Sequence, residues 1–236
     1  MTPEPAHAGS PDLDRRGPLP APSPRSAALD SLGSCGSFVH CRSGERISSH
    51  DNPHDYWYRV ISGVVRCCFV LFNGRRQIVD FLLPGDFFAA AGREEDYFCL
   101  EAVVDATVVA MYPRLPAEEL VDADPGVAKA VRDMAFRTIA RSHQQLLVRG
   151  QVTATAKVGW FLLNMERRLP RGRRLDEIVL PMSRYDIADY LALSVETVSR
   201  ALTSLRERRV IALSGARRLR ILDRAMLESG ERQDVQ

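Results

Sequence analysis

The sequence predicts an α+β fold with an N-terminal antiparallel β-roll, a long helix and a C-terminal winged helix-turn-helix. Short runs rich in β-branched and aromatic residues, separated by glycine turns, fill residues 35–113. Apolar residues at nearly helical spacing follow, and two short helical patterns with a hairpin pattern end the chain. The expected parts are a leader at 1–30, the roll at 31–122, a dimerisation helix at 123–150, the winged helix-turn-helix at 151–228 and a tail at 229–236.

The composition is that of a globular protein, with 45% hydrophobic and 26% charged residues in a chain of 236. No apolar run is long enough to cross a bilayer and the N-terminus lacks an apolar signal core, which predicts a cytoplasmic protein with no membrane partner. Residues 30–122 hold eight arginines against fourteen acidic residues, whereas residues 181–224 hold nine arginines against five. The basic C-terminal part favours a polyanionic partner.

The front of the chain gives the leader and the roll. Residues 1–27 contain seven prolines and few large apolar side chains, which predicts a disordered leader. Asn73-Gly74 stands between the runs VRCCFVLF and RRQIVDFLL, and this dipeptide favours the type I′ turn of a β-hairpin. Gly63 and the stretch LPGD at 83–86 mark further turns. Six to eight short strands predict a small antiparallel roll or barrel.

The long helix is expected to begin at Asp124-Pro125, because an acid followed by proline is typical of a first helical turn. A helix of about 25 residues is about 37 Å long, more than one small domain covers. We therefore predict that a second copy of the chain covers it in a homodimer. The apolar stripe expected at this interface consists of Val127, Val131, Met134, Thr138, Ile139 and Leu146. A further helix is expected over residues 156–169.

Two short helices joined by a tight turn are predicted from residue 183 onward. Ser183 is expected to cap a helix over 184–191, and Ser194 the helix that follows. The second helix has an apolar stripe at three-and-four spacing, formed by Val195, Val198, Leu202 and Leu205. The runs VIAL and RLRIL around Ser214-Gly215 predict a hairpin with arginines at its turn. Together these elements predict a winged helix-turn-helix.

The second helix also carries a polar face formed by Glu196, Ser199 and Arg200. Residues at i, i+3 and i+4 face the base edges together when the first turns of a helix enter the major groove of double-stranded DNA. Arg200 can donate to guanine O6 and N7, Glu196 can accept from cytosine N4, and Ser199 can contact thymine or adenine. A salt bridge on a solvated helix face would use the same residues, but the preceding turn, the cap and the arginine-bearing hairpin favour DNA reading. Contacts to the DNA backbone are expected from Arg184, Thr197, Thr203, Arg217 and Arg218.

The order of roll, long helix and winged helix-turn-helix resembles the CRP/FNR superfamily of bacterial transcription regulators. YWYRVISGVVR and GRRQIVDFLLPGDFF resemble the cyclic-nucleotide-binding-like roll of FixK-type members, and DIADYLALSVETVSRAL resembles their DNA-reading unit. Glu196, Ser199 and Arg200 match the reading triplet of the FNR branch, which recognises a TTGAT-N4-ATCAA-type palindrome. The resemblance implies a homodimeric regulator, mainly an activator, that binds RNA polymerase. It further implies a role in oxygen-limited metabolism such as microaerobic respiration, denitrification or nitrogen fixation.

Members of this superfamily sense signals in three ways: by binding cyclic AMP, through an iron–sulfur cluster or through haem. Members that bind cyclic AMP use a Gly-Glu pair and then an Arg followed by Ser or Thr. Here Gly85-Asp86 is followed by a region without such an arginine pair, which argues against cyclic AMP. FNR itself carries a [4Fe-4S] cluster on four cysteines. Cys35 and Cys41 have the spacing of one ligand pair, but the third N-terminal cysteine is missing and the place of the roll cysteine falls on Ala110.

Haem-binding members need an axial ligand, for which His40, His50, His54 and Cys41 are the candidates. We expect no cofactor, with control through the amount of protein or through thiol oxidation at Cys35, Cys41 or Cys99. An iron–sulfur or haem sensor is the alternative. A cupin-like metal enzyme is a further alternative, but it needs histidine and carboxylate ligands that converge inside the barrel. The few histidines before the main strands predict neither a metal site nor catalytic residues.

Overall fold

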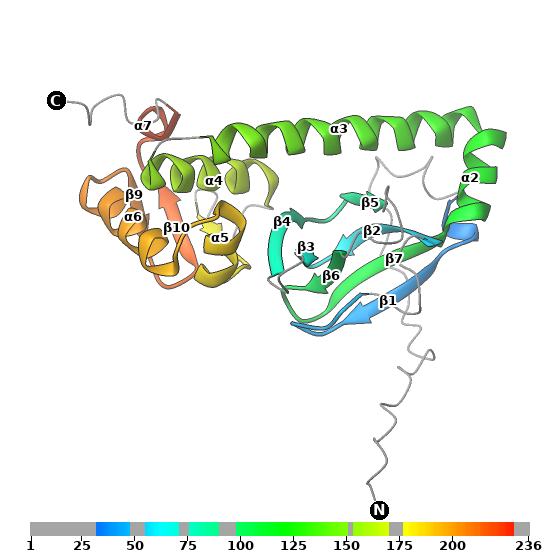
Figure 1. Cartoon of the computed structure of the whole chain (residues 1–236), viewed down its shortest axis with the longest axis horizontal. Helices are drawn as coiled ribbons and strands as arrows, with labels where there is room; N and C mark the ends of the chain where they lie inside the picture. Colours follow the sequence, from blue (N-terminus) through cyan, green and yellow to red (C-terminus); the bar gives the residue numbers. More distant parts are fainter. Residues whose placement is uncertain are drawn as a thin grey trace, which may run out of the picture.

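The computed structural model describes residues 32–47, 55–70, 76–89, 98–150, 153–169 and 177–228. The predicted leader and tail, the Asn73-Gly74 turn, and His50 and His54 lie outside these ranges. In the described part, a β-roll and a helical domain lie side by side, and one long helix runs above both (Figure 1). This arrangement confirms the predicted α+β fold.

The roll follows the 3-10 helix η1 (Leu32–Ser34) and contains two antiparallel sheets. One sheet has the order β1-β7-β2-β5 and the other the order β4-β3-β6. Buried side chains from both sheets, among them Tyr58, Leu82 and Met111, fill the space between them. The strands are β1 (Ser37–Cys41), β2 (Tyr56–Ser62), β3 (Val65–Val70), β4 (Arg76–Leu82), β5 (Phe87–Ala89), β6 (Phe98–Ala102) and β7 (Thr107–Pro113).

The predicted turn at Gly63 has a clear structural reason. Gly63 joins β2 to β3 with a φ of +80°, and a Cβ at this position would lie 2.3 Å from Thr107 Oγ1. Only glycine satisfies both the positive φ and the close approach. Strands β3 and β4 pair antiparallel, as the two arms of the predicted hairpin should.

Two helices connect the roll to the C-terminal domain: α2 (Arg114–Ala123), which the sequence did not reveal, and α3 (Pro125–Arg149). Asp124 caps α3 by accepting hydrogen bonds from the N–H groups of Gly126 and Val127, at 2.7 and 3.4 Å. This cap confirms the predicted start of the long helix. At the other end, the α3 axis continues as far as the C-terminal domain (Figure 1).

The predicted dimer stripe on α3 is wrong for Val127 and Met134. Both side chains are buried within the chain, in a cluster with Ala110 of β7 and Ala117 of α2. Val131 is partly buried against the same cluster, and Thr138 is half-buried. The reason is that α2 and the roll lie directly beneath α3 and cover one of its faces. Helical periodicity marks a face for burial but does not tell which neighbour buries it.

The C-terminal domain begins with α4 (Ala154–Arg168) and contains the two predicted short helices, α5 (Arg184–Leu191) and α6 (Val195–Glu207). Its three-stranded sheet has the order β8-β10-β9. The strands β9 (Ile211–Leu213) and β10 (Arg218–Ile221) confirm the predicted hairpin. The third strand, β8 (Ile178–Val179), has only two residues and gives no readable pattern. A short helix, α7 (Arg224–Glu228), packs on α4.

Candidate nucleic-acid interface

The helix α6 is held in place by a cap at its start and by one apolar face. Ser194 caps it, its hydroxyl accepting a hydrogen bond from the Thr197 N–H at 3.1 Å. Val198, Leu202 and Leu205 are buried in the core of the C-terminal domain, where α6 packs on α4. The predicted inward stripe and cap are therefore confirmed. Because three buried side chains seat the helix, the rotation of its outer face is well determined.

The outer face of α6 exposes Glu196, Ser199, Arg200 and Thr203. The pKa of Glu196 is lowered by a hydrogen bond from its own backbone N–H, by one from Ser194, and by the positive charge of Arg200. This carboxylate is therefore ionised near neutral pH and acts only as an acceptor. The structure brings the three predicted base-reading residues together on one solvent-facing side, as the sequence indicated. Thr197 is half-buried, and its hydroxyl lies 2.9 Å from that of Ser194.

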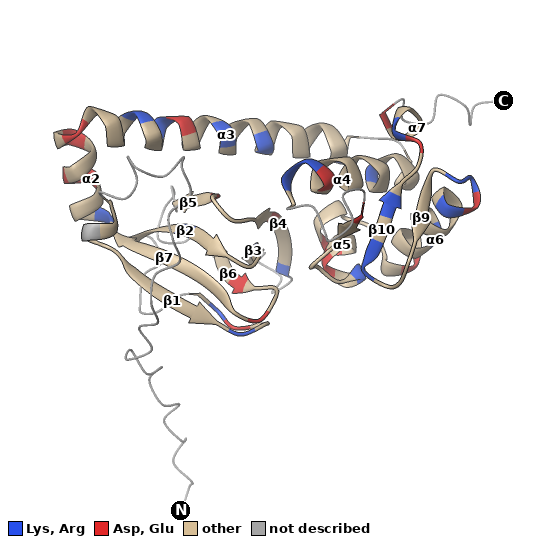
Figure 2. Ribbon diagram, turned by 180° about the vertical axis from the view of Figure 1, so that it is seen from behind, with Lys and Arg blue, Asp and Glu red and all other residues tan. Residues whose placement is uncertain are grey.

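The arginines predicted to contact the DNA backbone lie at two places beside α6. Arg217 and Arg218 are exposed in the β9–β10 hairpin, and Arg220, which was not predicted, is exposed on β10 beside them. Figure 2 shows this basic character along β10 and at the end of α6. Arg218 and Arg220 flank the buried Leu219, and strand residues two positions apart share a face. This alternation of polar and apolar residues could have identified Arg220 from the sequence.

Arg184 differs from these arginines because it is half-buried at the first turn of α5. Burial lowers the pKa of its guanidinium, and its Nη1 atom is buried with no hydrogen-bond partner. A buried N–H donor without a partner in the protein is suited to bind an anionic group of another molecule. Beside it, Ser183 and Asp186 form a complete capping box, which confirms the predicted helix start.

Helix α5 is docked on the roll by polar contacts that the sequence did not reveal. The Asp186 carboxylate pairs with Arg66 of β3 at 2.6 Å. The Asp189 carboxylate accepts a hydrogen bond from the backbone N–H of Ile78 on β4 at 3.1 Å. Around these contacts, Phe81 of β4 packs its ring against Tyr190 at a centroid distance of 5.2 Å. The roll and the helix-turn-helix are therefore packed together as well as joined by the chain.

A half-buried group of charges ties the long helix and α4 to the roll. Arg141 of α3 and Arg168 of α4 both pair with Asp86, at 2.5 and 2.6 Å. Asp80 lies 3.5 Å from Arg141 and 3.8 Å from Arg168. Burial raises the pKa of Asp80, and the two arginines oppose that effect. Two carboxylates and two guanidiniums compensate one another here, which is how proteins tolerate buried charge.

The same charges bear on cyclic-nucleotide binding. Asp86 follows Gly85 at the position where nucleotide-binding members carry Gly-Glu. Its carboxylate already accepts hydrogen bonds from the Leu83 N–H, Arg141 and Arg168. A group engaged in this way is not free to hold a ribose, and residues 93–104 contain no Arg followed by Ser or Thr.

The predicted redox thiols do not converge. Cys35 packs at the edge of the cluster under α3, Cys41 lies inside the roll, and Cys99 lies in the cluster that extends to the C-terminal domain. Burial and the charge of Glu45 raise the pKa of Cys41 to about 11, so its thiol stays protonated and unreactive. In the described ranges, no three His, Cys, Asp or Glu side chains gather in a way that would hold a metal ion.

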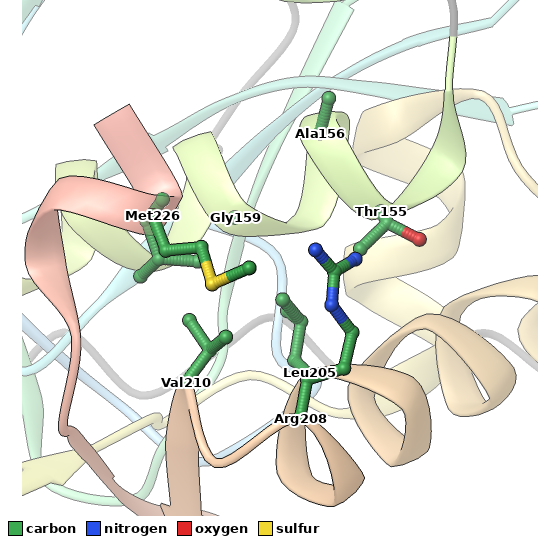
Figure 3. Close-up of a pocket in the computed structure, with 8 residues that line it drawn as sticks. Thr155, Ala156, Gly159, Leu205, Arg208, Val210 and Met226 are labelled. Atoms are coloured by element: carbon green, nitrogen blue, oxygen red, sulfur yellow. The ribbon is translucent and has the colours of Figure 1, made fainter. Parts of the chain in front are cut away.

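A small pocket lies between α4, the end of α6 and α7 (Figure 3). Its wall is mostly apolar, and Arg208 extends across it toward Thr155. No carboxylate, histidine or cysteine lines this pocket, so it has no pair of nucleophile and base. The lining residues are Thr155, Ala156, Gly159, Leu205, Arg208, Val210, Met226 and Leu227.

The outer face of α3 is apolar and exposed. Ile139 and Leu146 of the predicted stripe are 49% and 67% exposed. Phe136 and Leu147, which were not predicted, are 63% and 70% exposed on the same side. Ile139, Leu146 and Leu147 follow Phe136 at three, ten and eleven positions, close to whole helical turns, and this spacing was the signal that could have found Phe136 and Leu147. Four large apolar side chains in a row on one helix face form a surface suited to contact with another protein surface.

Comparison with known proteins identifies the family. Residues 38–122 match the cyclic nucleotide-binding domain and residues 156–229 match the Crp-like helix-turn-helix domain. The chain is 40% identical over 191 residues to the nitrogen fixation regulation protein FixK of Azorhizobium caulinodans, covering 80% of this chain and 76% of that protein. The chain belongs to the CRP/FNR family of transcription regulators. FixK of Rhizobium meliloti is 35% identical over 218 residues, with 92% of this chain and 93% of that protein covered.

The known structures agree with this assignment to the CRP/FNR family. The structure of FixK2 from Bradyrhizobium japonicum superposes with a TM-score of 0.73 and 36% identity, covering 85% of this chain and 99% of that one. As a CRP/FNR member, the chain is a DNA-binding transcription regulator and not an enzyme. The cupin-like alternative is therefore wrong. Among the described helices, none has the length and apolar character to span a membrane.

Proposed function

We propose that this CRP/FNR protein acts in the cytoplasm as a homodimeric transcription activator that binds a TTGAT-N4-ATCAA-like palindrome and contacts RNA polymerase. The observation that carries this proposal is the outer face of α6. Glu196, Ser199 and Arg200 are all exposed there, and the opposite face of the helix is buried. These residues occupy the first turns of the helix, which enter the major groove in helix-turn-helix proteins.

Each of the three side chains has a suitable partner in the proposed site. The Arg200 guanidinium donates two hydrogen bonds to guanine O6 and N7, and the ionised Glu196 accepts one from cytosine N4. The two contacts fall on the G·C pair of each half-site. Ser199 contacts a neighbouring thymine or adenine. Arg217, Arg218, Thr197, Thr203 and the half-buried Arg184 contact phosphates on either side.

The direct test is binding to a labelled TTGAT-N4-ATCAA duplex, compared with a scrambled duplex of the same composition. Arg200→Ala is expected to lose about 1–3 kcal/mol on the palindrome and little on the scrambled duplex. Arg206→Ala is the matched control, because it removes the same charge from a different side of the same helix. Equal loss of affinity on both duplexes would make Arg200 a phosphate contact. Wild-type protein that binds both duplexes equally would refute the proposed site.

The homodimer is proposed to form through the exposed apolar face of α3. This face is formed by Phe136, Ile139, Leu146 and Leu147. It extends far enough along the helix to pair with the same face of a second copy. Two-fold symmetry would then separate the two α6 helices by about 34 Å, one turn of DNA. Leu147→Glu is expected to give monomers in sedimentation, whereas Leu115→Glu, which makes the same change at a 73% exposed leucine of α2, is expected to leave the dimer intact. A dimeric Leu147→Glu protein would contradict this interface.

A role in oxygen-limited metabolism is supported by the relatives. Two of the most similar proteins are named as regulators of nitrogen fixation. The test is a reporter gene behind the palindrome, assayed in cells grown with air and with limiting oxygen. Expression that rises at low oxygen with the wild-type protein and is lost with Arg200→Ala supports the role. Expression that does not depend on oxygen argues against it.

We further propose that the protein works without a resident cofactor. The separation of Cys35, Cys41 and Cys99 into three clusters supports this proposal, as does the engaged carboxylate of Asp86. The test is the visible spectrum of protein purified without air, together with its iron content. A colourless protein without stoichiometric iron is the expected result. A brown protein with bound iron would favour the iron–sulfur alternative, and a sharp haem band the haem alternative.

A further inference from the structure

Two buried cysteines face each other across neighbouring strands of the roll. Cys68 of β3 and Cys99 of β6 are directly opposed in the antiparallel register. Opposed residues in such a pair point to the same face of the sheet, with Cα atoms about 4.5–5.5 Å apart. This spacing lies within the range that a disulfide bond spans. The adjacent Cys67 points to the opposite face, into the interior of the roll.

The two thiols interact in the reduced protein. The Cys68 thiol donates a hydrogen bond to the Cys99 sulfur, which raises the pKa of Cys68 and lowers that of Cys99. A hydrogen bond from Arg46 also lowers the pKa of Cys99, against the effects of burial and of Glu101. The pKa of Cys99 is therefore the lower of the two, so Cys99 more readily forms the thiolate, which is the nucleophile in cysteine oxidation.

We propose that Cys68 and Cys99 form a reversible dithiol–disulfide site that a hydroperoxide oxidises. The Cys99 thiolate attacks one peroxide oxygen, so an S–O bond forms, the O–O bond breaks and the leaving oxygen departs as water after taking up a proton. The Cys68 sulfur then attacks the Cys99 sulfenic acid, so the S–S bond forms, the S–O bond breaks and the proton of Cys68 leaves in a second water. Two thiols are oxidised by two electrons and one hydrogen peroxide is reduced. A dithiol reductant restores the pair by thiol–disulfide exchange.

The site adjoins the contacts that hold the helix-turn-helix on the roll. Cys68 and Cys99 belong to the cluster of buried residues that continues into the core of the C-terminal domain. The Cys99 thiol donates a hydrogen bond to Glu101 Oε1 at 3.8 Å, and Glu101 pairs with Arg66 at 2.7 Å. Arg66 in turn pairs with Asp186 of α5 at 2.6 Å. Formation of the disulfide turns the Cys99 sulfur toward Cys68 and away from Glu101. Glu101 is the first residue in the series of ion pairs that leads through Arg66 to Asp186.

The experiment is peptide mapping of the full chain by mass spectrometry. The reduced protein is treated with hydrogen peroxide, then denatured and alkylated. The expected result is a peptide pair linked through Cys68 and Cys99, a loss of two alkylatable thiols, and full recovery after dithiothreitol. Cys35, Cys41 and Cys67 are expected to remain alkylatable. Over-oxidised Cys99 beside a free Cys68, or a linkage that involves another cysteine, would overturn the proposal.

Two variants and one further measurement complete the test. Cys68→Ser is expected to stop at a sulfenic acid on Cys99, which dimedone traps, whereas Cys67→Ser removes the neighbouring thiol on the same strand and is expected to keep the disulfide. If Cys67→Ser loses the disulfide while Cys68→Ser keeps it, the assignment of the disulfide to Cys68 and Cys99 is overturned. Hydrogen exchange of the wild-type protein is expected to show faster exchange in α5 after oxidation, and unchanged exchange would refute the link to the helix-turn-helix. None of these readouts needs DNA, so they stand apart from the proposed site sequence.

Discussion

The substitution Asp186→Ala removes two stabilising contacts at once. The carboxylate accepts the Ser183 N–H at 2.9 Å within the capping box, and loss of a helix cap costs about 1 kcal/mol. It also pairs with Arg66, whose side chain is only 18% exposed. Removing one partner of a buried pair costs roughly 3–5 kcal/mol, but Arg66 keeps Glu101 at 2.7 Å, so a smaller penalty of about 2 kcal/mol is expected. The free energy of unfolding should therefore fall by about 3 kcal/mol, or about 6–12 °C in Tm.

Urea unfolding followed by tryptophan fluorescence measures this change. Trp57 lies in the roll and Trp160 in α4, so the signal reports on both domains. The control is Glu118→Ala, which also removes a carboxylate paired with an arginine at 2.7 Å, but in a surface pair where both side chains are 43% exposed. That variant should lose less than about 0.5 kcal/mol. If the two variants lose equal stability, the reasoning that burial and capping give Asp186 its importance is refuted.

Four further outcomes follow from the structure. Phe161→Ala should destabilise the protein by about 3–5 kcal/mol in urea unfolding, because its ring is fully buried; a loss below 1 kcal/mol would show that the core closes over the gap. Gly63→Ala should cost more than about 1 kcal/mol by the same assay, because the position has a positive φ and touches Thr107; an unchanged midpoint would contradict this. Cys41, with a pKa raised to about 11 by burial, should resist iodoacetamide at pH ~8 in the native state and react only after unfolding; rapid native labelling would disprove its burial. Arg217→Ala and Arg218→Ala should each weaken binding equally on cognate and scrambled DNA and reduce the slope of log K against log salt by about 1; a loss confined to the cognate duplex would make the residue a base reader.

The best sequence predictions concern α5 and α6, where the signals are local. Ser183 and Ser194 stand at the predicted caps, and the apolar stripe of α6 is buried as its spacing indicated. A cap and a helical stripe involve residues only three or four positions apart, so the sequence alone contains them. The same holds for Asp124 at the start of α3.

The errors concern contacts between elements. Val127 and Met134 were assigned to a partner but are buried by the chain's own roll, while Phe136 and Leu147 were overlooked on the outer face. Both sets of apolar residues have helical spacing, so periodicity alone does not distinguish them. The two-residue strand β8 was missed for a related reason, since its pairing with β10 exists only in the folded sheet.

The sequence by itself determined the order of the domains, the two helices of the helix-turn-helix and the polar residues that share the outer face of α6. Caps, turns and periodic burial are decided by near neighbours in the chain, whatever the rest of the molecule does. Only the tertiary structure decided that α5 is docked on β3 and β4 through Asp186 and Asp189, and that Cys68 faces Cys99. These contacts join residues far apart in the chain, and their geometry comes from strand register and domain packing, which no local pattern specifies.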